Sequence, residues 1–295
     1  RQRNRMLYLS RFAFPDWDDD YQFRLGLKRT CYNSIYPFFV LSERGLTEVE
    51  FAPVTVFYGG NGSGKTTALN VIAEALSLPR SAPFNRSDFF GDYVRRCSFA
   101  LAATPPAGAI VTSDDVFEYM LNMRTLSDDV DREREALLGE WVERKYEHFQ
   151  MRSLDDYDTL KKTLDARRKT QSAYVRERIA KNPREQSNGE SAYFYFTSRL
   201  QDAGLYLLDE PENSLSARRQ LELREFLEDA ARFFGCQFVI ATHSPFLLSL
   251  RGAKIYDLDA APARVKRWTQ LEDVRVAYDF FFSRRDEFDP PPSKS

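Results

Sequence analysis

Hydrophobic and polar residues follow three different patterns along the 295-residue chain. Before about residue 58, short apolar runs are separated by acidic or glycine-bearing turns, a pattern that predicts β-strands. From about 80 to 186 the apolar spacing becomes helical and charged residues become denser. From 187 onward the pattern alternates between helix and strand. The three early strand candidates are residues 7–14, 36–41 and 49–58.

The C-terminal third contains the most regular pattern. Apolar strands are predicted at 204–210, 237–242 and 253–259, and a helix over 214–235 separates the first two. Strands that are apolar on both faces and alternate with helices are typical of a parallel α/β sheet. The helix is predicted to end at a glycine cap and to bury one apolar face. Gly235 is the expected C-terminal cap of this helix. The residues expected on its buried face are Leu223, Phe226, Leu227, Ala230 and Phe234.

These patterns predict four parts of the chain. Residues 1–85 form an N-terminal β subdomain that ends in a glycine-rich loop and its helix. Residues 86–186 form a helical insertion, and residues 187–283 complete the α/β core. The charged and proline-rich residues 284–295 are expected to be a disordered tail.

Composition narrows the class of protein. Hydrophobic residues make up 43% and charged residues 29%, as in soluble globular proteins. The net charge of −2 gives no global attraction to nucleic acid, so any such surface must be local. No apolar run approaches the roughly 20 residues that span a bilayer. The three cysteines show no CxxC spacing, which argues against disulfides or zinc and for a reducing, cytoplasmic location.

The stretch "GGNGSGKT" at 59–66 is the strongest chemical signal. It fits GxxxxGK[ST] and lies between an apolar run and a predicted helix, as a phosphate-binding P-loop requires. Glycines let successive N–H groups curl around phosphate oxygens, and the helix adds its positive dipole end. Lys65 is expected to reach the β- and γ-phosphates and Thr66 to bind Mg²⁺. The phosphate-binding candidates are Gly59, Asn61, Gly62, Ser63, Gly64, Lys65, Thr66 and Thr67.

A second signal follows the apolar run 205–208. Asp209 and Glu210 come directly after it, at the edge of the sheet where ligands of α/β proteins bind. Asp209 is predicted to hold Mg²⁺, directly or through water, and Glu210 to orient or deprotonate the attacking water. Taken alone, two acids after a strand are often a surface or helix-capping feature. The P-loop makes the catalytic interpretation the better one.

Only two histidines occur in the chain. His148 lies in a charged helical stretch and is expected to be an ordinary surface residue. His243 follows the apolar strand 237–242 and precedes Ser244 and Pro245, which suit helix N-cap and N1 positions. We expect His243 to reach the γ-phosphate, the alternative being a histidine that is hydrogen-bonded within its loop.

The order and spacing of these motifs resemble the ABC-type ATPases across most of residues 50–260. "SNGES" at 187–191 is similar to the signature sequence of that family, with Ser187, Gly189 and Glu190 at the matching positions. Ser187 and Glu190 also fit a helix capping box. In the family this turn contacts the γ-phosphate of ATP bound to the other protomer. The resemblance therefore implies a homodimer with ATP and Mg²⁺ sandwiched between the subunits.

The sequence departs from the ABC pattern at several points. The family's dimer-contact aspartate is replaced by Ser216. The aromatic residue that stacks on adenine is not assigned, with Tyr36 and Phe38 as candidates. The usual glutamine between P-loop and signature is also not evident, and its possible substitutes are Ser113, Asp114, Asp115 and Gln150.

The "DEPENSLS" and "ATHSP" forms resemble the compact bacterial AAA/ABC-like ATPases related to the SMC/RecF group, some of which serve anti-phage systems such as Septu-type modules and retrons. Residues 161–184 carry nine Lys/Arg against two acids. That excess is suited to nucleic acid, to an acidic protein partner, or simply to a solvated helix face.

Together these features predict an ATP hydrolase that regulates a nuclease or a nucleic-acid partner, in phage defence or DNA repair. Two alternatives stay open at this point. One is an ATP-binding switch with negligible turnover, and the other is the nucleotide-binding subunit of a transporter.

Overall fold

The computed structural model describes residues 6–28, 34–119, 195–200 and 203–288. The chain divides into two compact units, residues 1–116 with 192–295, and residues 117–191. Almost all of the second unit lies outside the described residues, so the fold below is that of the first. None of the helices within the described ranges is both long and apolar enough to cross a membrane.

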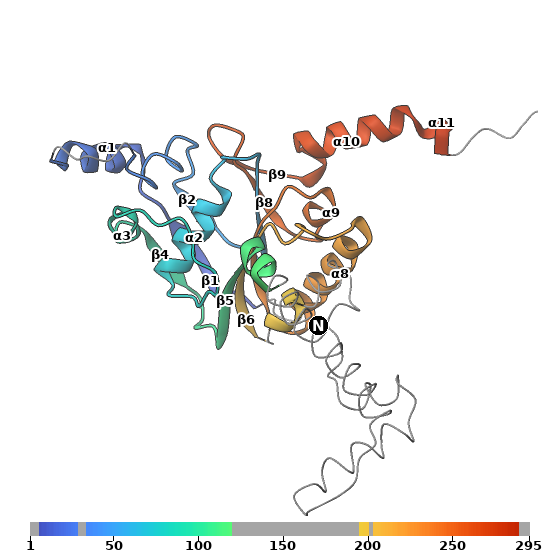
Figure 1. Cartoon of the computed structure of the whole chain (residues 1–295), viewed down its shortest axis with the longest axis horizontal. Coiled ribbons are helices and arrows are strands. Elements are labelled where there is room, and N and C mark those ends of the chain that lie inside the picture. The colour runs from blue at the N-terminus through green and yellow to red at the C-terminus, as the bar shows by residue number, and fades with distance from the viewer. Residues whose placement is uncertain (1–5, 29–33, 120–194, 201–202, 289–295) are drawn as a thin grey trace, which may run out of the picture. The chain divides into compact units, whose positions relative to one another are not determined.

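The larger sheet carries the phosphate-binding edge. Its strands are β3 (Val54–Tyr58), β5 (Ala107–Thr112), β6 (Gly204–Asp209), β7 (Gln237–Ala241), β8 (Lys254–Asp257) and β9 (Arg264–Lys266). They run in the order β5-β6-β7-β3-β8-β9. Figure 1 labels β5, β6, β8 and β9 of this sheet. All neighbouring pairs are parallel except β8 and β9. Every residue of β3, β6 and β7 is buried, which confirms the predicted parallel α/β core.

The helices around this sheet begin and end at the residues their sequence favours. Helix α2 (Lys65–Ala75) follows the P-loop and packs on β5, β6 and β7. Helix α8 (Ala217–Phe233) packs on β7, and the short α9 (Pro245–Leu248) starts at the predicted Ser244 cap. Within α8, Leu223, Leu227 and Ala230 are buried as expected. Phe226 is half-buried. Phe234 is exposed because it lies past the helix end, where Gly235 adopts a left-handed φ of 69°.

A small antiparallel sheet forms the N-terminal part. Strand β1 (Leu9–Ala13) pairs with β2 (Glu48–Glu50) on one side and with β4 (Ser98–Leu101) on the other. The buried side chain of Gln237 joins the two sheets. It accepts from Tyr8 N at 2.7 Å and Leu9 N at 2.8 Å, and donates to Leu9 O at 2.8 Å. The first strand of the small sheet is thereby fixed to β7.

The apolar run 36–41 is turn rather than the predicted strand. Helix α1 (Trp17–Gly26), which the sequence patterns did not indicate, supplies the reason. Its buried Asp20 accepts from Phe39 N at 2.8 Å and from Ser42 Oγ at 2.5 Å. A backbone N–H that strand pairing would use therefore goes to a side chain.

Other segments also differ from the sequence predictions. Strands β4 and β5 lie in the range that was expected to be helical, after a short α3 (Phe90–Val94). The chain ends in η3 (Trp268–Gln270), α10 (Glu272–Ser283) and α11 (Arg285–Phe288), so residues 285–288 of the expected disordered tail are helical. A single hydrophobic core nevertheless links both sheets, and it includes Phe12, Phe57, Leu69, Leu207 and Val239.

Candidate functional site

The P-loop lies between β3 and α2 at the carboxyl edge of the large sheet. Gly64, the N-cap of α2, has a φ of +97°. A Cβ there would lie 2.9 Å from Leu41 Cδ2 and 3.3 Å from Val40 Cγ1, so the position requires glycine for conformation and for space. The loop bounds a pocket of about 400 Å³. Its lining is Tyr36, Val40, Asn61, Gly62, Ser63, Gly64, Lys65, Thr66, Thr67 and Glu210.

Lys65 is held inside this loop. Its side chain is 4% exposed, and Nζ donates to Gly59 O at 2.6 Å and to Gly60 O at 3.0 Å. The nearest carboxylate oxygen, Glu210 Oε1, lies 4.0 Å from Nζ. From the other side, Gly60 N donates to both carboxylate oxygens of Asp259 at 2.9 and 3.1 Å. Asp259 thus fixes the start of the loop, a role that the sequence did not suggest.

Thr66 and Asp209 meet directly. Thr66 Oγ1 donates to Asp209 Oδ1 at 3.1 Å. The pKa of Asp209 is raised to about 7, chiefly by burial and also by the nearby Glu210 and Glu212, while the Thr66 hydrogen bond and Lys65 act to lower it. A hydroxyl and a carboxylate are the oxygen ligands that Mg²⁺ takes beside nucleotide phosphates. The donor set therefore fits Mg²⁺ supplied with a nucleotide. The residues that the structure describes contain no group of three or more His, Cys, Asp or Glu suited to binding a metal by themselves.

Glu210 occupies a strained position just after β6. Its φ of +46° lies in the left-handed region, which non-glycine residues rarely adopt and which is often found at functional sites. Its carboxylate is held on one side by Asn213, whose Nδ2 donates to Oε2 at 3.0 Å. The other oxygen, Oε1, lies 3.9 Å from His243 Nδ1. Glu210 is thus fixed at the mouth of the P-loop pocket.

His243 lies on the loop after β7, the strand between β6 and β3. Glu210 N donates to Ala241 O at 2.9 Å and Thr242 N to Phe57 O at 3.1 Å, so hydrogen bonds connect the carboxyl ends of the three strands. The His243 side chain is 48% exposed, and its Nδ1 lies 3.5 Å from Glu212 Oε1. The structure therefore brings Lys65, Glu210 and His243 together as predicted, although their catalytic roles stay predictions.

Several predicted residues do not join this group. Phe38 is buried and stacks on Phe23, so it is wrong as an adenine-stacking candidate. Tyr36 lines the pocket, and its hydroxyl lies 3.1 Å from Thr67 Oγ1, within hydrogen-bond distance. Burial raises the Tyr36 pKa. Asp115 is buried and accepts from Thr112 N and Ala82 N, which is a structural role.

Asp114 is exposed and Ser113 half-buried, and nothing in the structure assigns either to nucleotide. The signature residues Ser187, Gly189 and Glu190 lie outside the described residues, as do His148, Gln150 and the basic stretch 161–184.

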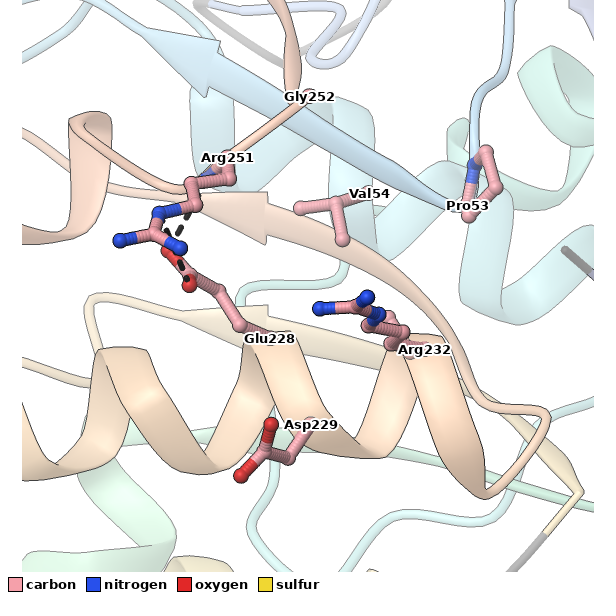
Figure 2. Close-up of a pocket in the computed structure, with 8 residues that line it drawn as sticks. Pro53, Val54, Glu228, Asp229, Arg232, Arg251 and Gly252 are labelled. Atoms are coloured by element: carbon pink, nitrogen blue, oxygen red, sulfur yellow. Dashed lines mark hydrogen bonds and ion pairs between the residues drawn. The ribbon is translucent and has the colours of Figure 1, made fainter.

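A second hollow lies at the opposite edge of the sheet, where β3 begins. Figure 2 shows the residues that line it, and its volume is about 240 Å³. Two of the charged residues that line it, Arg251 and Glu228, contact each other. Arg251 Nε lies 3.8 Å from Glu228 Oε2, and the backbone N of Arg251 donates to Glu228 Oε1 at 3.1 Å. The other lining residues are Pro53, Val54, Asp229, Ala231, Arg232 and Gly252. The P-loop pocket is lined by the phosphate-binding backbone, so we assign the nucleotide there.

A strand–P-loop–helix unit in the same parallel sheet as a strand that leads into an acidic pair defines a P-loop nucleotide-binding fold. Residues 176–249 match the family model described as "AAA domain, putative AbiEii toxin, Type IV TA system". This match confirms the predicted AAA-type resemblance over that segment, which is well under half of the chain. A search of curated proteins gave no match.

Two of the solved structures to which this chain is similar show low overall similarity. One is an inward-facing "putative metal-chelate type ABC transporter", at 16% identity and a TM-score of 0.38, covering 79% of this chain and 82% of that one. The other is the Smc head domain of Pyrococcus furiosus with an extended coiled coil, bound to the C-terminal domain of ScpA. It has 13% identity and a TM-score of 0.42, and covers 95% of this chain and 100% of that chain.

Proposed function

We propose that the protein is a Mg²⁺-dependent ATPase that dimerises around ATP and regulates a nuclease or other nucleic-acid-processing partner. The observation that carries the ATPase proposal is the convergence of Lys65, Asp209 and Glu210 at one edge of the sheet. They come from β3–α2 and β6, yet Thr66 contacts Asp209 at 3.1 Å and Lys65 lies 4.0 Å from Glu210. Such a group of charges has little structural purpose of its own.

Hydrolysis requires a water molecule in line with the bond from the γ-phosphorus to the bridging oxygen. Glu210 is placed to orient this water and accept its proton as the new P–O bond forms and the bridging P–O bond breaks. Lys65 and the first-turn N–H groups of α2 stabilise the negative charge on the phosphates. Mg²⁺, held by Thr66 and Asp209, would neutralise further charge on the phosphate oxygens when it is bound.

A dimer is proposed because the sequence 187–191 resembles the signature turn that, in ABC-type ATPases, contacts ATP bound to the other protomer. In this scheme Ser187 and Gly189 of one protomer contact the γ-phosphate held by the other, and Glu190 caps the signature helix. The family description that matches residues 176–249 names a putative toxin of a toxin–antitoxin system. That description supports a defence role, and the basic stretch 161–184 is the proposed surface for nucleic acid or an acidic partner.

Steady-state ATP hydrolysis with and without Mg²⁺ tests the enzymatic part. We expect Glu210→Gln to lower kcat by roughly 10²- to 10⁴-fold, as loss of a general base does, and to leave ATP binding intact. Glu225→Gln, an exposed acid on α8, is the matched control and should hydrolyse ATP like wild type. Wild-type protein that binds ATP without measurable turnover would support the switch alternative instead.

Light scattering tests the dimer. The Glu210→Gln variant should have the mass of a dimer in the presence of ATP and Mg²⁺. The double variant Glu210→Gln with Ser187→Arg should have the mass of a monomer under the same conditions. A monomer in the first sample, under conditions where ATP is bound, would overturn the dimer proposal without affecting the assignment of the nucleotide pocket.

A further inference from the structure

Glu212 is a carboxylate buried between two loops of the site. It is 5% exposed and lies in the turn after β6. Its Oε1 accepts from Thr242 Oγ1 at 2.6 Å, from His243 N at 3.0 Å and from Ser244 N at 3.3 Å. Its Oε2 is buried and has no hydrogen-bond partner in the structure. One oxygen of this side chain therefore accepts hydrogen bonds from three successive residues of the β7–α9 loop.

Holding this loop does not require a negative charge. The carbonyl oxygen of a glutamine would accept the same three hydrogen bonds, and burying a carboxylate costs more free energy than burying an amide. A carboxylate is useful here only if a positive charge or a proton must be balanced. His243 Nδ1 is the group in range, 3.5 Å from Glu212 Oε1.

Two carboxylates lie near His243 Nδ1. Besides Glu212 Oε1, Glu210 Oε1 lies 3.9 Å away, and Lys65 Nζ lies 4.0 Å from the same Glu210 oxygen. A proton fixed on Nδ1 leaves Nε2 as the atom that meets a phosphate. Nε2 can donate to a phosphate oxygen only when the ring carries a second proton, and Glu212 then balances the positive charge.

We propose that Glu212 is a positioning residue that keeps a proton on His243 Nδ1 and supports a positively charged His243 when a γ-phosphate is present. The second proton comes from solvent. The proposal rests on the proposed ATPase function for the γ-phosphate step, whereas the state of Nδ1 can be measured without nucleotide. Glu212 would thus make His243 discriminate ATP from ADP.

Nitrogen-15 NMR of the histidines tests the first part. Because the chain has only two histidines, His148→Gln leaves a single imidazole to observe. Without nucleotide at neutral to mildly alkaline pH, we expect the neutral ring to carry its proton on Nδ1, and Glu212→Gln to shift it toward Nε2. A neutral ring protonated mainly on Nε2, or one that Glu212→Gln does not change, would overturn the proposal whether or not the protein hydrolyses ATP.

Binding of a non-hydrolysable ATP analogue and of ADP tests the second part. We expect Glu212→Gln to weaken analogue binding roughly 10- to 100-fold, the effect of losing one charge-assisted hydrogen bond, with ADP affinity unchanged. In a His243→Ala background the same substitution should have no further effect, because Glu212 acts through the ring. Equal loss for both nucleotides, or additive losses in the double variant, would contradict this.

Gln220→Ala is the matched control. Gln220 also holds this loop, through Ser244 Oγ at 2.6 Å to its Oε1, but it does not contact His243. It should leave both the analogue-to-ADP ratio and the Nδ1 proton as in wild type. If Gln220→Ala lowers the ratio as much as Glu212→Gln does, general loosening of the loop is the cause and the proposal fails. Wild-type protein that binds neither nucleotide would refute the ATPase proposal, and the NMR result would still decide the role of Glu212.

Discussion

Thr66 Oγ1 donates a hydrogen bond to Asp209 Oδ1 at 3.1 Å, although the two residues are 143 positions apart in the chain. The contact joins the start of α2 to the end of β6, two strands away from β3 in the sheet. This hydroxyl and this carboxylate are where Mg²⁺ is expected to bind with the nucleotide.

Metal dependence should therefore disappear when either oxygen is removed. We expect Thr66→Ala and Asp209→Asn to bind ATP with the same affinity in Mg²⁺ and in EDTA, because the ligands that distinguish the two conditions are lost. Titration calorimetry measures this. Asp229→Asn, which changes an acid of the second hollow, should keep the Mg²⁺ dependence of wild type. A Mg²⁺ effect that survives in both site variants would place the metal elsewhere.

The pKa of Asp209 predicts an unusual pH dependence of stability. Burial raises this pKa from 3.8 to about 7, so the folded chain holds a proton that the unfolded chain has released between these values. The free energy of unfolding should then fall as pH rises from about 4 to about 7, by up to about 1.4 kcal/mol for each pH unit. Asp209→Asn cannot release this proton, and urea unfolding across that range should show a flatter curve for the variant. Parallel curves would contradict the raised pKa.

Alanine substitutions at two glycines of the P-loop separate the cost of backbone strain from the cost of a steric clash by the added Cβ. Gly62 and Gly64 both have left-handed φ values, of +79° and +97°. An added Cβ meets nothing within 4 Å at Gly62, whereas at Gly64 it meets Leu41 at 2.9 Å. Gly62→Ala should cost about 1–2 kcal/mol from backbone strain alone. Gly64→Ala should cost clearly more, and denaturant unfolding of both variants compares them. Equal losses would mean that the Leu41 contact relaxes.

Asn213 predicts a catalytic defect without a binding defect. Its side chain holds Glu210 Oε2 at 3.0 Å, so Asn213→Ala should lower kcat by roughly tenfold as the carboxylate loses its orientation. ATP affinity should stay at the wild-type value, because Asn213 does not line the pocket. Single-turnover hydrolysis and equilibrium binding separate the two effects. A matching loss of affinity would show that Asn213 supports the pocket itself.

Gln237 predicts a large loss of stability far from the nucleotide. Replacing it with leucine leaves Tyr8 N and Leu9 N buried without an acceptor, at about 1–3 kcal/mol for each. Gln270→Leu is the control, since that exposed glutamine accepts from Arg267 N in contact with solvent. Thermal unfolding should separate the two variants by many degrees. Similar melting temperatures would mean that water replaces Gln237.

The sequence predicts the parts of this molecule in which local pattern and tertiary role agree. Strands β6 and β7 are apolar on both faces because the sheet is covered on both sides, and the P-loop needs its glycines for conformation. The strand predicted at residues 36–41 is wrong because the buried Asp20, distant in sequence, accepts a hydrogen bond from the backbone N–H of Phe39. The structural roles of Glu212 and Asp259 could not be predicted from the sequence either. A polar residue after a strand gives the same sequence pattern whether its side chain faces water or a neighbouring loop.

The connection between β5 and β6 has a consequence for how such chains vary. Ala107 to Thr112 pair in register with Gly204 to Asp209, yet residues 113–203 intervene and contain the whole second unit, 117–191. The entropy lost in closing a connection grows only with the logarithm of its length, so neighbouring strands tolerate a long excursion at little cost. The part of this crossover that precedes the signature-like turn, up to residue 186, can therefore change in length at little cost to the pairing of β5 with β6.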